Sequence, residues 1–491
     1  MRRFSIRWKF TGMLVLAAAL FFGSLDPAAA DTEVKISGDA YIYENYWKQF
    51  QYTGLDYTGT QTLDPMSIYE RFRVRLDCIA NENLSFRLAL KTSEVPWGHG
   101  TLTVDNPSPA FSKVYQAYVQ FKWPGTHIEF TVGLQDMDLP FSVDWLDANP
   151  VFGSTRTASA MVSIPVADQL KIVGGFTRLL DTNAGFDPTT TAQAGDLDAF
   201  ILTLPIELSG FTATPWSMIA VAGRDAGYGA VQVGNGGYSN ETLATNLLSA
   251  ASLGSGTGWK NSQNAYWWVG STLALTALDP FKFYADLMYG SGNDTDHDRF
   301  KRRGSFFDLA AEYTGLDLLT PQATFWYSPG EDGSASNGSE RMPSVVDYWS
   351  PSNSFLFDGD QAFDNGFMNI NPVGAYGVVA ALNKISFIQS LTHRLTVSFA
   401  HGDNSPAAFR AANALQGTGN YVQIGRDLTD KESVVAIGFD NKYDVYQNLA
   451  LILETGWSHG DFQTSVWGHR LANATRDGDA YKVTVGLKYK Y

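Results

Sequence analysis

The sequence predicts an all-β fold: a transmembrane antiparallel β-barrel of about 16–18 strands, with short periplasmic turns and long extracellular loops. Three observations predict it. Short segments of alternating polarity recur along the chain, tight turns alternate with long polar connections, and the last strand has aromatic residues at both ends of its apolar face. After the first 30 residues, no apolar run reaches the roughly 20 residues that a transmembrane helix needs.

The first 30 residues have the character of an export signal. A basic start with four Lys or Arg residues precedes an apolar stretch at 11–22, and three alanines at 28–30 suit a signal peptidase. A permanent membrane anchor is the alternative, but the apolar stretch is too short and ends in Asp26-Pro27. We therefore expect a cleaved secretory signal peptide at 1–30 and one barrel domain at 31–491.

Charge and cysteine content narrow the class of protein. Removing the signal's net +3 from the chain's −15 leaves −18 on the mature chain. Such an acidic balance argues against nucleic acid as a partner, because phosphate binding needs a basic surface. Cys78 is the only cysteine, so no intramolecular disulfide can form despite export. Another source of stability is needed, and a closed sheet supplies one.

The C-terminal segment, residues 481–491, gives the sharpest strand signal. Its apolar positions carry aromatic residues at both ends: Tyr481, Val483, Val485, Leu487, Tyr489 and Tyr491. Its polar positions are Lys482, Thr484, Gly486, Lys488 and Lys490. Successive strand side chains point to opposite faces, so one face is apolar with aromatic ends, as a lipid-facing strand requires. A strand of a soluble β-sandwich would also alternate.

The spacing of the connections is an independent argument. Short connections fall near residues 81–83, 123–126, 166–168, 209–211, 278–280, 315–316, 389–390 and 444–446. Long polar connections fall near 51–67, 93–109, 136–155, 180–195, 225–263, 291–304, 328–372, 402–431 and 460–478. This alternation predicts about 18 strands, or 16 if one pair is wrongly divided, with both chain ends periplasmic. Within the loops, residues 406–415 after Ser405 and residues 240–252 read as short helices.

One predicted strand carries a ladder of arginines. Arg71, Arg73 and Arg75 occupy every second position and share one face, while Phe72, Val74 and Leu76 form the opposite, lipid side. The next strand adds Arg87 and Lys91 to the lumenal face. Five like charges on adjacent strands repel one another unless acids or water screen them.

The third long loop offers such acids: Asp136, Asp138, Asp144 and Asp147. If this loop folds inward, its carboxylates would face the arginine ladder across a narrowed pore and create a transverse field. The candidate pore constriction is therefore Arg71, Arg73, Arg75, Arg87, Lys91, Asp136, Asp138, Asp144 and Asp147. The alternative is that the arginines line a wet lumen and form only local ion pairs.

The chain resembles the homotrimeric porins of the bacterial outer membrane, and most closely those of sulfate-reducing bacteria. The resemblance spans the mature chain and rests on the opening strand at 34–41, the arginine ladder, the acidic third loop and the aromatic C-terminus. It implies a homotrimer, residues 136–155 as constriction loop and residues 93–109 as a latch between subunits. Two departures stand out: the third loop has Leu139-Pro140-Phe141-Ser142, where general porins have Pro-Glu-Phe-Gly-Gly, and Tyr491 replaces the usual phenylalanine.

These features predict a water-filled channel in outer-membrane lipid for passive diffusion of small hydrophilic solutes and ions. A substrate-specific sugar or anion channel is the alternative, followed by a non-conducting structural barrel and an outer-membrane enzyme. We expect no catalysis, because neither a Gly-x-Ser-x-Gly motif nor a Ser/His/acid grouping stands out. The seven histidines are scattered, so we expect no metal or cofactor. The sign of ion selectivity stays open, since an acidic chain favours cations and the ladder favours anions.

Overall fold

The computed structural model describes residues 32–49, 52–54, 66–92, 96–97, 111–153, 155–182, 195–231, 241–254, 259–294, 297–334, 336–345, 349–357, 363, 370–416, 421–475 and 479–491. The expected signal peptide at 1–30 and most of the expected latch at 93–109 lie outside the described residues.

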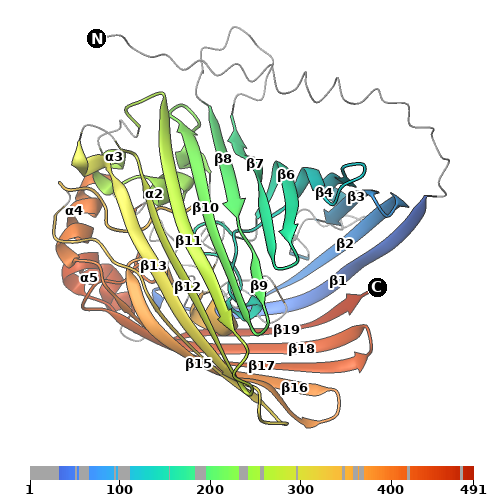
Figure 1. Ribbon diagram of the computed structural model, residues 1–491. Coiled ribbons are helices and arrows are strands. Elements are labelled where there is room, and N and C mark those ends of the chain that lie inside the picture. The colour runs from blue at the N-terminus through green and yellow to red at the C-terminus, as the bar shows by residue number, and fades with distance from the viewer. Residues whose placement is uncertain are drawn as a thin grey trace, which may run out of the picture.

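The described residues form one closed antiparallel sheet (Figure 1). Its strands are β1 (Glu33–Lys48), β2 (Met66–Asn81), β3 (Leu84–Thr92), β4 (Phe111–Lys122), β5 (Glu129–Met137), β6 (Thr155–Ala167), β7 (Leu170–Asp181), β8 (Asp196–Thr203), β9 (Ile206–Leu208), β10 (Phe211–Gly223), β11 (Gln263–Leu275), β12 (Phe281–Gly292), β13 (Arg302–Tyr313), β14 (Thr320–Tyr327), β15 (Ala375–Ile388), β16 (Leu391–Gly402), β17 (Ser433–Tyr446), β18 (Leu449–Asp461) and β19 (Ala480–Lys490). Pairing of β1 with β19 closes the sheet. Closure leaves no exposed strand edge, which the hydrocarbon layer could not solvate.

The barrel has 18 strands, because β8 and β9 are two parts of one strand. Both pair with β7 on one side and with β10 on the other. The interruption falls at Pro205, which has no backbone N–H for the ladder. Pairing is kept around it: Leu204 donates to the carbonyl of Pro215 and Pro205 accepts from Lys171. The expectation of about 18 strands is confirmed and the 16-strand alternative is excluded.

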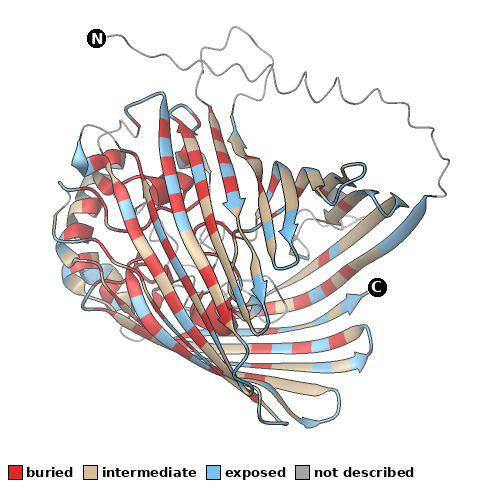
Figure 2. Cartoon of the chain, in the orientation of Figure 1, coloured by how far each residue is buried: buried red, intermediate tan, exposed pale blue. Residues whose placement is uncertain are grey.

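Buried and exposed residues alternate along many strands of the wall (Figure 2). The exposed positions carry mostly apolar residues and form the outer face, whereas the inner face is mixed. On β19, Val483, Val485 and Leu487 are exposed, whereas the alternate residues Lys482 and Thr484 are buried toward the interior. Exposed aromatic residues such as Trp267 and Tyr289, in contact across β11 and β12, lie on the same outer face. This is the alternation that a lipid-facing barrel wall requires.

The predicted order of short and long connections is also confirmed. Each short connection joins a pair such as β2–β3 or β17–β18, and each long one joins the intervening pair. The first and last strands end together on the short-turn side, where Gly38 and Tyr491 exchange two backbone hydrogen bonds of 2.9 and 3.1 Å. Among the described residues, no helix has the length and apolar character needed to span a membrane.

Helices gather at the long-loop end of the barrel (Figure 1). They are α2 (Leu243–Leu247), α3 (Ala250–Gly254), α4 (Pro406–Gln416) and α5 (Thr464–Thr475). α4 confirms the predicted helix, and the Ser405 hydroxyl accepts a hydrogen bond from the amide of Ala407. The single helix expected at 240–252 is two short ones, because the chain leaves helical geometry at Leu248. α5 was not predicted. Its helical backbone geometry is interrupted at Gly468, whose φ is 81°.

A buried ion cluster ties three loops together at this end. Asp427 lies between Arg341, at 2.7 Å, and Arg426, also at 2.7 Å, and Arg426 reaches Glu241 at 3.7 Å. These residues come from the β10–β11, β14–β15 and β16–β17 connections. Burial alone would raise the pKa of the Asp427 carboxyl, but Arg426 and Arg341 outweigh it and hold the pKa below its ordinary value.

We expect Asp427→Asn to loosen this loop cluster by about 3–5 kcal/mol, because it leaves two buried guanidinium groups without their main counter-charge. Since the pKa of Asp427 is lowered by folding, its stabilisation is present above about pH 4 and is lost as the pH falls below that value. Limited proteolysis of the loops, at neutral and acid pH, measures both effects. The exposed Asp225, changed to Asn, is the control; equal protease sensitivity of the two variants would contradict the prediction.

Candidate pore constriction

The connection between β5 and β6, residues 138–154 (L3), folds into the barrel. Its 3-10 turn Asp144–Leu146 carries Leu146, which is fully buried against Ala274 of β11, Tyr284 of β12 and Ala310 of β13. These strands lie on the far side of the barrel from β5 and β6. L3 therefore crosses the lumen, as the sequence resemblance implied for a constriction loop.

Polar contacts fix the inserted part of L3. Ser142 Oγ donates a 2.5 Å hydrogen bond to a carboxylate oxygen of Asp286 on β12. Asp286 is the cross-strand partner of Asp308 on β13, and both side chains are fully buried. Within the loop, the amide of Leu139 donates to the carbonyl of Phe152 at 3.1 Å. L3 thus rests on a pair of buried acids in the opposite wall.

A second connection, residues 328–374 between β14 and β15 (L7), also enters the lumen, and the sequence did not indicate this. Trp349 packs against Trp326 of β14, with ring centroids 5.1 Å apart, and against Phe306 of β13. Further along, Phe363 stacks on Tyr43 of β1 at 4.9 Å. The described parts of L7 therefore contact the wall from β13 round to β1.

Glycines in the wall make room for the aromatic residues of L7. A Cβ at Gly456 on β18 would lie 2.4 Å from the ring of Phe355, and a Cβ at Gly486 on β19 would lie 2.8 Å from that of Phe363. Both distances are far below van der Waals contact. Any larger residue at these positions would push L7 away from the wall.

The inserted loops fill one side of the lumen and leave the other open. L3 and L7 meet where the amide of Val345 donates to the carbonyl of Val151 at 2.8 Å. Beneath them, inward residues of β16 and β19 such as Ser398 and Thr484 are buried. On β2 and β3 the inward side chains of Arg73 and Arg87 stay 19% and 32% exposed. Figure 2 shows this difference between the two sides of the wall.

The arginine ladder lies on the lumenal face of β2, and its contacts are local. Arg73 forms an ion pair of 2.7 Å with Asp39 on β1. Arg71 places its guanidinium 4.0 Å from the ring centroid of Tyr41, and Arg75 donates a 3.0 Å hydrogen bond to the Tyr115 hydroxyl. On β3, Arg87 pairs with Asp77 at 2.6 Å, and Lys91 lies directly opposite Lys113 on β4.

Three basic residues of this wall were missing from the sequence-based site: Lys113, Lys488 and Lys490. The last two are cross-strand partners of Tyr41 and Asp39, so they extend the ladder onto β19. The polar face of the C-terminal strand, which carries both lysines, was the signal that could have placed them. Lys113 could not be found, because a bulge between Ala89 and Leu90 of β3 shifts the register of β4.

The aspartates of the third loop divide into two groups. Asp136 lies in strand β5 rather than in the loop, because the β5–β6 ladder continues to Met137 and pairs Asp136 with Arg156. Its carboxylate is 2.7 Å from Arg156. Asp138, Asp144 and Asp147 lie in L3 and are exposed. The opposition of these aspartates to the ladder across the pore stays a prediction.

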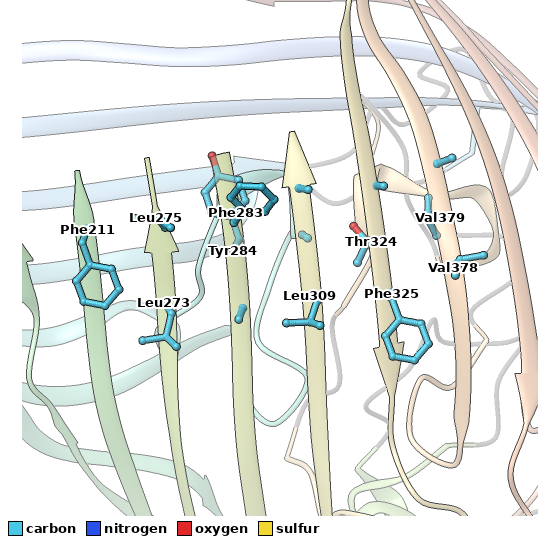
Figure 3. A pocket seen from close by; sticks show the side chains of 15 residues that line it. Phe211, Leu273, Leu275, Phe283, Tyr284, Leu309, Thr324, Phe325, Val378 and Val379 are labelled. Atoms are coloured by element: carbon cyan, nitrogen blue, oxygen red, sulfur yellow. The ribbon is translucent and has the colours of Figure 1, made fainter. Parts of the chain in front are cut away.

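A separate hollow lies on the outside of the barrel (Figure 3). It has a volume of about 600 Å³ and is bordered by outward side chains of β10–β15, among them Phe211, Leu309 and Phe325. Ala311 and Ala323 are among the small residues that line it. It faces the lipid and is not part of the pore.

No protein-family model and no curated protein sequence matches this chain. Among solved structures it is similar to OccK11 (OpdR) of Pseudomonas aeruginosa, with a TM-score of 0.50, 11% identity, and 93% of this chain and 95% of that chain covered. It is also similar to the outer membrane protein OprD of Pseudomonas aeruginosa, with a TM-score of 0.49, 11% identity, and 96% and 98% covered. At these identities the likeness is one of fold.

The fold is that of the bacterial outer-membrane porins: a closed 18-stranded barrel with loops folded into its lumen. The apolar outer wall places the chain in the bacterial outer membrane.

We expect Leu146→Asp to release the tip of L3, because it would bury an unpaired charge against Ala274 and Ala310. The lumen would widen and single-channel conductance would rise severalfold. Planar-bilayer recording measures this. Leu146→Met, which keeps the apolar volume, is the matched control and should leave conductance unchanged. Equal conductance in both variants would mean that L3 does not limit the pore.

Proposed function

We propose that this chain is an outer-membrane porin that passes small hydrophilic solutes and ions by diffusion along the wall formed by β2, β3, β4 and the short-turn end of β19, where Lys488 and Lys490 lie. One observation carries the proposal: L3 and L7 cover the opposite wall, whereas the inward side chains of Arg73 and Arg87 stay accessible to water. A structural barrel with a filled lumen would bury both walls.

The charge of this open wall favours anions. Its lumenal positions carry a continuous set of basic residues: Arg71, Arg73, Arg75, Arg87, Lys91, Lys113, Lys488 and Lys490. Asp39 and Asp77 offset two of these charges through the ion pairs described above. Charged rings in a low-dielectric wall set the ion preference of a channel. The net acidity of the whole chain matters less, since charges beyond about 10 Å are screened by salt.

A substrate-specific anion channel is the second candidate, and the double insertion of L3 and L7 favours it. L3 is held against the wall by Leu146, and L7 is held by Trp349. Together they restrict the shape of a passing solute more than a single inserted loop would. Saturable, competable flux of one class of anion would support specificity. Flux that falls smoothly with solute size would support a general porin.

The homotrimer implied by the sequence resemblance is part of the proposal, as is the kinship with porins of sulfate-reducing bacteria. Support comes from the sequence features quoted above and from the porin fold. We also propose that the chain is not an enzyme, because the basic wall offers charge and width for transport rather than a nucleophile beside a base.

The first test is single-channel conductance of the mature protein in a planar bilayer. Discrete steps with a reversal potential that favours anions are expected. A well-folded barrel that stays silent in the bilayer would remove the porin proposal and leave a plugged or structural barrel.

The double variant Arg75→Gln, Lys113→Gln should lower the anion-to-cation permeability ratio. At roughly 10 Å through water, each lost charge weakens the attraction of an anion by ~0.4 kcal/mol and the repulsion of a cation by the same amount, so each changes the ratio about 4-fold and the two together lower it about 16-fold at low ionic strength. Reversal potentials in a salt gradient measure it. Arg303→Gln removes an exposed charge on the outward-facing set of β13 positions and is the matched control. An unchanged ratio in the double variant would remove this wall from the ion path.

A further inference from the structure

The outer hollow over β10–β15 has the size and lining of a ligand site. Its volume of about 600 Å³ is within the range of about 300–1,000 Å³ that is usual for small-molecule pockets. Figure 3 shows Phe211 and Phe325 on its two sides, with Leu273 and Leu309 between them. Part of its floor is a row of alanines that lie directly opposite one another on β13, β14 and β15: Ala311, Ala323 and Ala380.

The outer hollow lies in the half of the wall nearest the short turns. β12 begins at Phe281, and Phe283 borders the hollow two residues later. β11 ends at Leu275 and β10 begins at Phe211, and both of these residues border it. The short turns of an outer-membrane barrel are periplasmic. Lipid at this depth therefore belongs to the periplasmic leaflet, which in a bacterial outer membrane consists of phospholipids.

A concave apolar wall holds an acyl chain more firmly than a flat one. A flat wall touches a lipid chain on one side only. In the outer hollow, the alanines contact a chain from below, while larger side chains such as Leu309 and Phe325 contact it from the side. Dispersion attraction is small for one pair of atoms and large for many, so a chain in the hollow exchanges more slowly than its neighbours.

Two charged residues of opposite sign lie at the short-turn end beside the hollow. Lys384 on β15 is exposed and follows the lining residue Ala380 by four positions, about 13 Å along a strand. Asp317, in the turn between β13 and β14, is also exposed. This turn is joined to β15 by a 3.0 Å hydrogen bond from the amide of Ser386 to the carbonyl of Leu318. A headgroup that contains both a phosphate and an ammonium group complements this pair.

We propose that the outer hollow binds one phospholipid of the periplasmic leaflet, with an acyl chain in the hollow, the phosphate at Lys384 and the headgroup ammonium at Asp317. Phosphatidylethanolamine is the lipid class that carries these groups. A second exposed carboxylate, Asp279 in the turn between β11 and β12, favours an ammonium further. It disfavours a headgroup with a net negative charge.

A phospholipid is the occupant because the two parts of the site match its two parts. The lining of the hollow is apolar, and an acyl chain asks for no hydrogen bond there. The charged residues lie at the end of the wall where headgroups begin. A transmembrane segment of another protein could cover the apolar part, but it would offer no phosphate to Lys384. The hollow is outside the pore, so the site does not depend on the proposed channel function.

Lipid retention by the mature protein tests the location. Native mass spectrometry of protein extracted in mild detergent should show one retained phospholipid per chain, with the mass of a phosphatidylethanolamine. Ala311→Leu with Ala323→Leu fills the hollow from two directly paired positions and should lower the retained fraction about 10-fold. Ala158→Leu with Ala160→Leu adds the same volume at exposed positions of β6 and is the matched control. Equal retention in the two double variants would overturn the proposal.

Defined lipids added back to delipidated protein test the headgroup. Dioleoyl phosphatidylethanolamine should bind more tightly than dioleoyl phosphatidylglycerol, which has the same chains and no ammonium. Asp317→Asn should remove most of this preference, and Lys384→Gln should weaken both lipids, because both contain phosphate. Asp168→Asn, in the exposed short turn between β6 and β7, is the control and should change neither. Equal binding of the two lipids would overturn the headgroup assignment, and a polypeptide retained in place of lipid would overturn the whole proposal.

Discussion

The absence of water in the hydrocarbon layer is the constraint on which the rest of this structure depends. Every backbone N–H and C=O of the wall has to find a partner within the sheet, and the pairing of β1 with β19 provides the last of them. Closure in turn fixes the alternation of apolar and polar residues on all strands. It also explains why Pro205 is tolerated: its carbonyl and the amide of Leu204 keep the ladder joined across the break.

Closure at 18 strands creates a second requirement, because a barrel of this width is not filled by wall side chains alone. L3 and L7 meet that requirement from one side. Glycines such as Gly456 leave space for their aromatic residues, and the buried acids Asp286 and Asp308 receive L3. The outcome is an asymmetric lumen with a packed half and a basic, hydrated half.

The fold was predictable from sequence because its signal is local. A period of two residues within each strand and the alternation of short and long connections do not depend on distant contacts, and the ladder on β2 was placed by parity alone. Contacts that depend on register were not predictable. Pairing of Arg73 with Asp39 follows from the alignment of β2 on β1, and the strand position of Asp136 follows from how far the β5–β6 hairpin extends. Aromatic residues such as Trp349 in a Gly- and Ser-rich loop carry no sign of which surface they will meet.

The position of Phe363 bears on the order in which parts of the protein fold. Its ring rests on Tyr43 of β1 and beside Gly486 of β19, two strands from opposite ends of the chain. That seat exists only once the seam between the first and last strands is complete. Contacts so distant in sequence form late, after the local hairpins. Phe363 can therefore reach its final position only after the barrel has closed, whereas Trp349 can pack on β13 and β14 before closure.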